Sequence, residues 1–147
     1  MADPYEALRL KNQLCFPLFL CAKEVTRRYE EFLAPLGLTY SQYVVMMYLW
    51  EQGESNCKAM SHALMLDPST LTPLLKRLED KGYVTRTRDK ADGRNLLLAL
   101  TPEGEALKDR ALAVPAQMGA CFALEPEEAL TLYRLTRKVL KNVTTHP

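Results

Sequence analysis

Apolar residues recur three and four residues apart in the first part of the chain, which is the spacing of one helix face. This pattern predicts an amphipathic helix from about Tyr5 to Leu33, with its end marked by Pro35 and Gly37. Pro17 lies inside the stretch and predicts a kink or a boundary there. The apolar positions of this helix are Leu8, Leu14, Phe16, Leu18, Phe19, Val25, Tyr29, Phe32 and Leu33.

A capping box and an apolar run predict a buried helix next. Thr39 can cap the first turn, and Gln42 occupies the third helical position that a capping box requires. The run 43–50 is apolar on nearly every side, which is typical of a helix inside a core. Gly53 is a natural end for it.

Two further short helices follow with a polar break between them. The first is expected at about 58–66, and the second begins where Asp67 can cap and Pro68 takes the first helical position. The second helix should reach residue 80 or 81 and end at Gly82. The expected inward positions of the first are Met60, Ala63, Leu64 and Leu66.

The periodicity then changes from helical to alternating. Residues 83–88 alternate between apolar and polar, and residues 96–100 do so more loosely. The polar segment 89–95 between them contains an Asp-Gly pair, so the sequence predicts a β-hairpin.

Two long helices are predicted at the C-terminal end. Thr101 and Pro102 repeat the cap-then-proline pattern, and this helix should run to about Phe122 with a kink at Pro115. The last helix begins near residue 125, with acidic residues first and basic residues later, as the helix dipole favours.

This order of elements predicts a mainly α fold with a winged helix-turn-helix and one β-hairpin wing. The DNA-binding unit would span 39–100 inside a single domain, 1–147. The flanking helices at 5–36 and 102–145 exceed what so small a core needs. Their apolar faces therefore predict dimerisation with a second copy of the chain.

Composition narrows the class of protein further. The 147 residues are 48% hydrophobic and 25% charged, with a net charge of +1, which fits one globular domain. No apolar run is long enough to span a membrane and no secretory signal is visible, so we expect a cytoplasmic protein with reduced thiols and no membrane partner. A phosphate-binding loop, a metal-ligand cluster and a nucleophile–His–acid arrangement are missing from the sequence, so we expect no enzyme, cofactor or metal.

The second helix of a helix-turn-helix enters the major groove, and its N-terminal residues meet base edges. In this chain Ser69, Thr70 and Thr72 are the short polar side chains suited to bases or phosphates. Lys76 and Arg77 are candidates for phosphate contacts. The segment 67–100 also carries the small basic excess, with 7 Lys and Arg against 5 Asp and Glu.

The predicted hairpin tip carries Lys90, Asp92 and Arg94. A tip arginine suits a narrow minor groove, where the potential is most negative. We expect Asp92 to orient the Arg94 guanidinium. The alternative is a solvated hairpin whose charges lie on the surface without a partner.

Several segments resemble the MarR family of dimeric winged-helix repressors. The run 92–94 matches the family's Asp-x-Arg wing signature, and 66–78 looks like the recognition helix of the organic-hydroperoxide-sensing branch, OhrR. The blocks 12–18 and 38–43 are similar to the reactive-cysteine motif and another segment of that branch. The resemblance covers residues 10–118. The cysteine block and the recognition helix, taken together, are specific for the OhrR branch.

The resemblance implies a redox-sensing repressor that binds a pseudo-palindromic double-stranded DNA operator as a reduced homodimer. Cys15 would be the thiolate that an organic hydroperoxide oxidises, while Tyr29 and Tyr40 of the partner subunit would donate hydrogen bonds to its sulfur. Phe16 and Phe19 would line a pocket for bulky organic peroxides. Without the resemblance, a cysteine on an apolar helix face is usually a small core residue.

An oxidised Cys15 must be resolved by another thiol. On one helix Cys21 would lie about 9 Å further along, too far for a disulfide, and Cys57 begins a helix of the DNA-reading unit. The resemblance implies an intersubunit disulfide with Cys121, although it places the family's cysteine one position earlier, at Ala120. The alternative is a sensor capped by a small cellular thiol.

Three other functions remain open from the sequence. A MarR-type repressor can be released by a non-covalent phenolic or lipid-like ligand between its helices. A thiol peroxidase would turn over peroxide without binding specific DNA. A structural helix-turn-helix would bind a protein partner instead of DNA.

Overall fold

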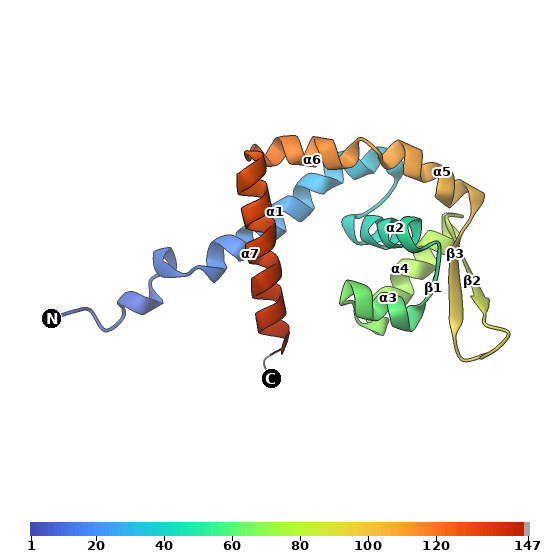
Figure 1. Cartoon of the computed structure of the whole chain (residues 1–147), viewed down its shortest axis with the longest axis horizontal. Helices are drawn as coiled ribbons and strands as arrows, with labels where there is room; N and C mark the ends of the chain where they lie inside the picture. Colours follow the sequence, from blue (N-terminus) through green and yellow to red (C-terminus); the bar gives the residue numbers. More distant parts are fainter. Residues whose placement is uncertain (146–147) are drawn as a thin grey trace. The chain divides into compact units, whose positions relative to one another are not determined.

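The computed structural model describes residues 1–145, and the chain divides into two compact units, Met1–Leu112 and Ala113–Pro147 (Figure 1). The mainly α winged-helix architecture is confirmed. The first unit contains η1 (Glu6–Leu8), η2 (Leu10–Asn12), α1 (Cys15–Leu33), η3 (Ala34–Leu36), α2 (Tyr40–Gln52), β1 (Glu54–Asn56), α3 (Cys57–Leu64), α4 (Pro68–Asp80), β2 (Val84–Arg88), β3 (Leu96–Leu100) and α5 (Pro102–Ala111). The second contains α6 (Val114–Phe122) and α7 (Pro126–Thr145).

The sheet has three antiparallel strands in the order β1-β3-β2. The predicted hairpin is formed by β2 and β3, which pair from Val84 with Leu100 to Arg88 with Leu96. The strand β1 was not predicted, because three residues are too few to establish an alternating pattern. It pairs with β3, whose central Leu98 is fully buried.

The helix-turn-helix is formed by α3 and α4. The turn begins at Met65, which adopts a left-handed conformation with a φ of 53°. Asp67 takes the predicted N-cap position of α4, but its side chain accepts no capping hydrogen bond. Pro73 lies inside α4 without ending it, at the sixth residue of the helix.

The helix α2 forms the centre of the core. Its capping box is confirmed, because the Gln42 backbone N–H donates to Thr39 Oγ1 at 3.2 Å and the Thr39 backbone N–H donates to Gln42 Oε1 at 3.1 Å. Fully buried side chains of α2 are Val45, Met46 and Leu49. At the end of α2, Trp50 Nε1 donates to the Gly104 carbonyl of α5 at 3.0 Å.

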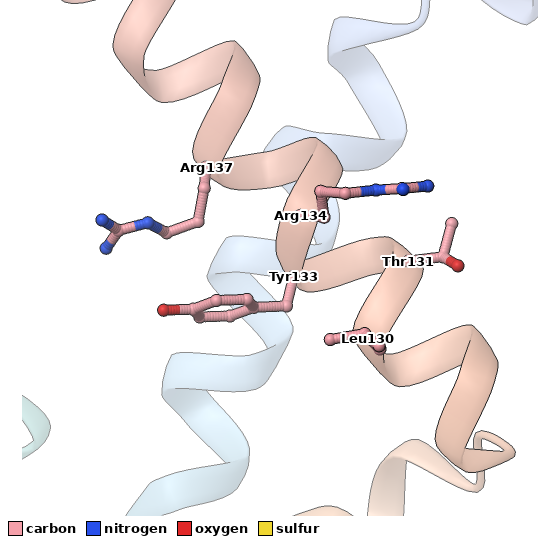
Figure 2. Close-up of a pocket in the computed structure, with 5 residues that line it drawn as sticks. All are labelled: Leu130, Thr131, Tyr133, Arg134 and Arg137. Carbon is pink, nitrogen blue, oxygen red and sulfur yellow. The ribbon is translucent and has the colours of Figure 1, made fainter.

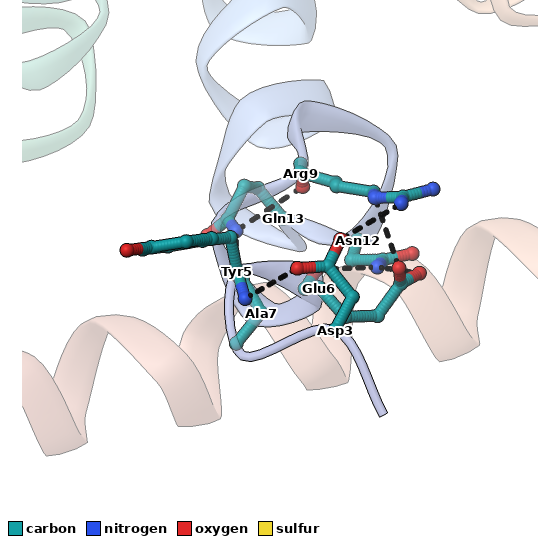
Figure 3. Close-up of polar contacts among 7 residues, drawn as sticks. All are labelled: Asp3, Tyr5, Glu6, Ala7, Arg9, Asn12 and Gln13. Atoms are coloured by element: carbon teal, nitrogen blue, oxygen red, sulfur yellow. Dashed lines mark hydrogen bonds and ion pairs between the residues drawn. The ribbon is translucent and has the colours of Figure 1, made fainter. Parts of the chain in front are cut away.

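The predicted start of the first long helix at Tyr5 is wrong, because α1 begins at Cys15. Residues 6–12 form two short 3₁₀ turns stabilised by local polar contacts (Figure 3). Arg9 forms ion pairs with Asp3 and Glu6, each at 2.9 Å, and Asn12 Nδ2 donates to the Glu6 carbonyl at 2.8 Å. These side chains satisfy the backbone in a way that competes with a continuous helix.

Pro17 marks a helix boundary, which is one of the two alternatives predicted for it, because α1 begins two residues before it at Cys15. It is the third residue of that helix, where the backbone N–H would have no intrahelical partner in any case. Pro115 does mark an interruption, because α5 ends at Ala111 and α6 begins at Val114. Pro115 has no backbone N–H to donate to the Ala111 carbonyl, so a continuous helix would lose one hydrogen bond where α5 ends.

The two helices of the second unit are apolar over much of their exposed surface. In α6, Val114 and Met118 are buried, whereas α7 has no buried residue among those described. Exposed apolar residues of α7 are Leu130, Leu132, Tyr133, Leu135, Val139, Leu140 and Val143. Within residues 1–145, no helix combines the length and apolar character needed to cross a membrane.

We predict that Gly104→Ala destabilises the protein. A Cβ at position 104 would lie 2.1 Å from the Tyr83 carbonyl oxygen, which is backbone and cannot rotate away. Such overpacking typically lowers the free energy of unfolding by about 1–3 kcal/mol. Urea unfolding of the wild type and of Gly104→Ala measures this difference. Gly119→Ala is the matched control, since a Cβ there meets no atom of the chain within 4 Å, and it should not destabilise the protein.

Candidate functional site

The helix α4 separates its residues into a buried and an exposed face. Leu71, Leu74, Leu75 and Leu78 are buried at the spacing of one helix face. All five residues predicted to contact DNA from this helix are exposed: Ser69, Thr70, Thr72, Lys76 and Arg77. Lys76 also forms an ion pair with Asp80 at 2.9 Å, an exposed contact of the kind that contributes little to stability and exchanges readily.

The wing tip is a well-defined turn that presents Arg94 to solvent. Asp92 Oδ1 accepts from the Arg94 backbone N–H at 3.1 Å, and the Asn95 N–H donates to the Asp92 carbonyl at 3.0 Å. The Asp92 carboxylate contacts the backbone and Asn95 of this turn, and its expected role in orienting the Arg94 guanidinium stays a prediction. Arg88, the last residue of β2, stabilises the wing tip by donating from its side chain to the Gly93 carbonyl at 2.8 Å.

The structure brings the recognition helix and the wing together around one open groove of about 660 Å³. Thr72 of α4 and Arg94 of the wing both line it, as the predicted DNA-contacting surface requires. Lys58, Ser61 and His62 of α3 line the same groove and were not predicted. The signal was available, because positions 58, 61 and 62 form the polar face of α3 at helical spacing.

Cys57 also lines the groove, but its environment favours a protonated thiol. Burial raises the pKa of Cys57, and the nearby Arg86 guanidinium offsets only part of that shift. Arg86 itself forms an ion pair with Glu79 at 3.0 Å, and this hydrogen bond raises the pKa of Arg86 and lowers that of Glu79. A thiol of this kind is a poor nucleophile, which agrees with a packing role for Cys57.

The predicted sensor residue Cys15 is the first residue of α1 and is exposed. Phe16 beside it is half-buried, whereas Phe19 is 65% exposed in the single chain. Cys121 is exposed as well, on α6 of the second unit. The pairing of Cys15 with Cys121 stays a prediction.

The two tyrosines predicted to act together do lie together. The rings of Tyr29 in α1 and Tyr40 in α2 have their centroids 4.7 Å apart, and Tyr43 lies 5.9 Å from Tyr29. Burial raises the pKa of both Tyr29 and Tyr43, and Tyr40 adds to each shift. Tyr29 therefore keeps its phenolic proton at neutral pH and remains a hydrogen-bond donor.

A second hollow, of about 440 Å³, lies on the surface of α7 and is lined by residues of that helix alone. Figure 2 shows Tyr133 and Arg137 projecting to one side of the helix, with Thr131 and Arg134 on the other. The Arg137 guanidinium lies 5.8 Å from the centroid of the Tyr133 ring. In the described part of the chain, no group of His, Cys, Asp or Glu residues could hold a metal ion.

Recognition helix, wing and groove define a winged-helix regulator, and comparison with known sequences identifies its family. A profile of the family described as "Transcriptional regulator SarA/Rot" matches residues 27–111. The organic hydroperoxide resistance transcriptional regulator of Bacillus subtilis is 41% identical over 115 residues, 78% of each chain. The regulator SarZ of Staphylococcus haemolyticus is 39% identical over 140 residues, 93% of this chain and 95% of that one.

Solved structures agree with the sequence relatives. Reduced AbfR of Staphylococcus epidermidis bound to DNA matches with a TM-score of 0.78 and 33% identity, over 96% of this chain and 99% of that one. A disulfide form of AbfR matches with a TM-score of 0.68 and 34% identity, over 95% of each chain. BpsR of Bordetella bronchiseptica matches with a TM-score of 0.83 and 25% identity, over 93% of this chain and 97% of that one. The DNA binding of BpsR is regulated by 6-hydroxynicotinic acid.

The two sequence relatives, at 41% and 39% identity, and AbfR, at 33%, each match over three quarters of the chain or more. The chain belongs to the MarR family of winged-helix transcriptional regulators, and within that family it is OhrR-like.

We predict that the buried tyrosines make the protein sensitive to alkaline pH. The folded-state pKa of Tyr29 and Tyr43 lies above the unfolded value of about 10, so the unfolded chain loses these protons first and stability falls as pH rises past that value. Urea unfolding should show this fall, and the double variant Tyr29→Phe, Tyr43→Phe should flatten it. Tyr5→Phe is the control, because Tyr5 is 68% exposed; equal slopes in all three proteins would contradict the prediction.

Proposed function

We propose that this protein is a redox-sensing transcriptional repressor. In the reduced state a homodimer binds a pseudo-palindromic DNA operator, and oxidation of Cys15 by an organic hydroperoxide releases it. Residues 39–100 read the DNA, while 5–36 and 102–145 form the dimer, so that residues 1–147 act as one regulator.

The observation that carries the proposal is the groove between the recognition helix and the wing. Thr72 and Arg94 line it together with Lys58 and His62, so donors and positive charge converge where a DNA strand would pass. The exposed face of α4 supplies the residues for the major groove, and the exposed Arg94 suits the minor groove beside it. The structural relative AbfR was solved bound to DNA, which supports DNA binding by this chain.

Dimer formation follows from the apolar surface that a single chain leaves in water. Seven apolar residues of α7 are exposed, and Leu14, Leu18 and Phe19 are exposed on or beside α1. Exposed apolar side chains in such number on one helix are typical of an interface. Two-fold symmetry would then place two recognition helices about one turn of DNA apart.

The sensing chemistry is assigned to Cys15. Its thiolate attacks the terminal oxygen of a hydroperoxide, an S–O bond forms as the O–O bond breaks, and the alkoxide leaves as an alcohol after taking up a proton. The Cys121 thiolate of the partner subunit then attacks the Cys15 sulfenic acid, and hydroxide leaves as water. Before oxidation, Tyr29 and Tyr40 donate from the partner subunit to the Cys15 sulfur, and Phe16 and Phe19 contact the organic group.

A second candidate function is release by a non-covalent ligand. The structural similarity to BpsR, whose DNA binding responds to 6-hydroxynicotinic acid, favours it. This candidate predicts reversible release by a small aromatic acid, with no change in the mass of the protein.

The first prediction from the proposal concerns Cys15→Ser. Fluorescence anisotropy on the chain's own upstream DNA should show that cumene hydroperoxide weakens wild-type binding by at least about tenfold. Cys15→Ser should bind as tightly and ignore the peroxide. Cys21→Ser is the matched control, since Cys21 is an exposed thiol on the same helix, and it should respond like wild type. Release of the Cys15→Ser variant would show that the sensor lies elsewhere.

The second prediction concerns the resolving thiol. Peroxide-treated wild type should run as a covalent dimer in non-reducing electrophoresis, whereas Cys121→Ser should remain a monomer. With a small thiol present, Cys121→Ser should instead gain the mass of that thiol on Cys15. Cys57→Ser should still form the covalent dimer, and a covalent dimer of Cys121→Ser would overturn the assignment.

A further inference from the structure

The corner between α1 and α2, residues 34–39, is contacted by cations from two other helices. Lys81 Nζ, at the C-terminal end of α4, donates to the Gly37 carbonyl and, at 3.0 Å, to Gln42 Oε1. Arg110 Nη2 of α5 donates to the Pro35 carbonyl at 2.5 Å. The corner is thus connected directly to the recognition helix.

Gln42 is the residue through which Lys81 reaches the start of α2. Its side chain is 2% exposed and is the buried polar side chain of the core. Gln42 Oε1 accepts from the Thr39 backbone N–H at 3.1 Å and from Lys81, so both of its lone pairs are used. Without the Lys81 ammonium, a buried acceptor and the Gly37 carbonyl would each lose a charged donor, which weakens the capping box.

The capping box fixes the position of Tyr40, the first residue of α2. The Tyr40 ring packs on Tyr29 of α1 with centroids 4.7 Å apart. A movement of this tyrosine pair therefore acts on the corner, and the corner acts on α4 through Lys81. The four buried leucines of α4 make that helix move as a rigid element, so a shift of its C-terminal end also moves Ser69 and Thr72.

We infer that Lys81 is a positioning residue that couples the sensing tyrosines to the recognition helix. This inference rests on the proposed function, because it assigns the route by which oxidation at Cys15 changes the placement of α4. A lysine suits the role, since its flexible stem reaches from α4 to the corner and its ammonium supplies three donors.

The experiment compares Lys81→Met, Lys81→Arg and wild type as full-length proteins. The quantity measured is the ratio of the operator Kd after and before treatment with cumene hydroperoxide, by fluorescence anisotropy. Cys15 sulfenic acid is followed in parallel by labelling with dimedone and mass spectrometry. Lys108→Met is the matched control, because the ion pair of Lys108, with Glu105 at 3.8 Å, lies within its own helix.

We expect Lys81→Met to oxidise Cys15 at the wild-type rate and yet show a Kd ratio smaller by about fivefold or more. Lys81→Arg restores donors and charge and should return the ratio to within about twofold of wild type. Lys108→Met should match wild type. If Lys81 had only a structural role, Lys81→Met would change the stability or the operator affinity of the protein. It would not lower the Kd ratio while Cys15 oxidation stays at the wild-type rate.

An unchanged Kd ratio in Lys81→Met would overturn the inference while leaving the proposed function intact. A wild-type protein that ignores peroxide would instead overturn the proposed function. Lys81 is exposed, so the variant should fold, as circular dichroism can verify. If Lys81→Met loses helical content, Lys81→Gln, which is uncharged but polar, takes its place. The same ratio of operator Kd values after and before peroxide is then measured for Lys81→Gln.

Discussion

The burial of one leucine face of α4 is the constraint on which the rest of the structure depends. Leu71, Leu74, Leu75 and Leu78 are at most 8% exposed, and burying a leucine side chain contributes about 1.5–3 kcal/mol. That face fixes the rotation of the helix about its axis, so the opposite face must carry Ser69 and Thr72 to solvent. The position of the DNA-reading surface thus follows from packing, before any contact with DNA is made.

The flanking helices leave apolar side chains exposed that a second copy of the chain would cover. The helix α7 buries no residue among those described, and Phe19 on α1 remains 65% exposed. A chain with this much exposed apolar surface gains stability by association, so the proposed dimerisation would be linked to folding. In the proposed function Cys15 is the sensing cysteine on such a helix, so its environment would depend on the partner subunit. A covalent change there would act on the quaternary arrangement instead of on the DNA contacts themselves.

The parts of the fold that the sequence predicts well are those with a local physical cause. The capping box at Thr39 and Gln42 and the hairpin around Gly93 each depend on residues a few positions apart. The 3₁₀ turns before Cys15 and the strand β1 depend on side-chain contacts and pairing partners that no periodicity reveals. The site divides in the same way: the exposure of the α4 residues follows from the helix period, whereas the use of Asp92 by the turn, and the groove that joins α3 to the wing, require coordinates.

A connection between Tyr40 and α4 also constrains the energetics of regulation. If the oxidised protein binds operator DNA more weakly by some factor, thermodynamic linkage requires that bound DNA shift the equilibrium between the oxidised and reduced forms toward the reduced form by the same factor. The corner that includes Gly37 would carry this coupling in both directions, because one hydrogen-bonded contact from Lys81 joins it to the recognition helix. Under the proposed function, operator-bound protein in equilibrium with a reductant would then favour the reduced form of Cys15 more strongly than free protein does.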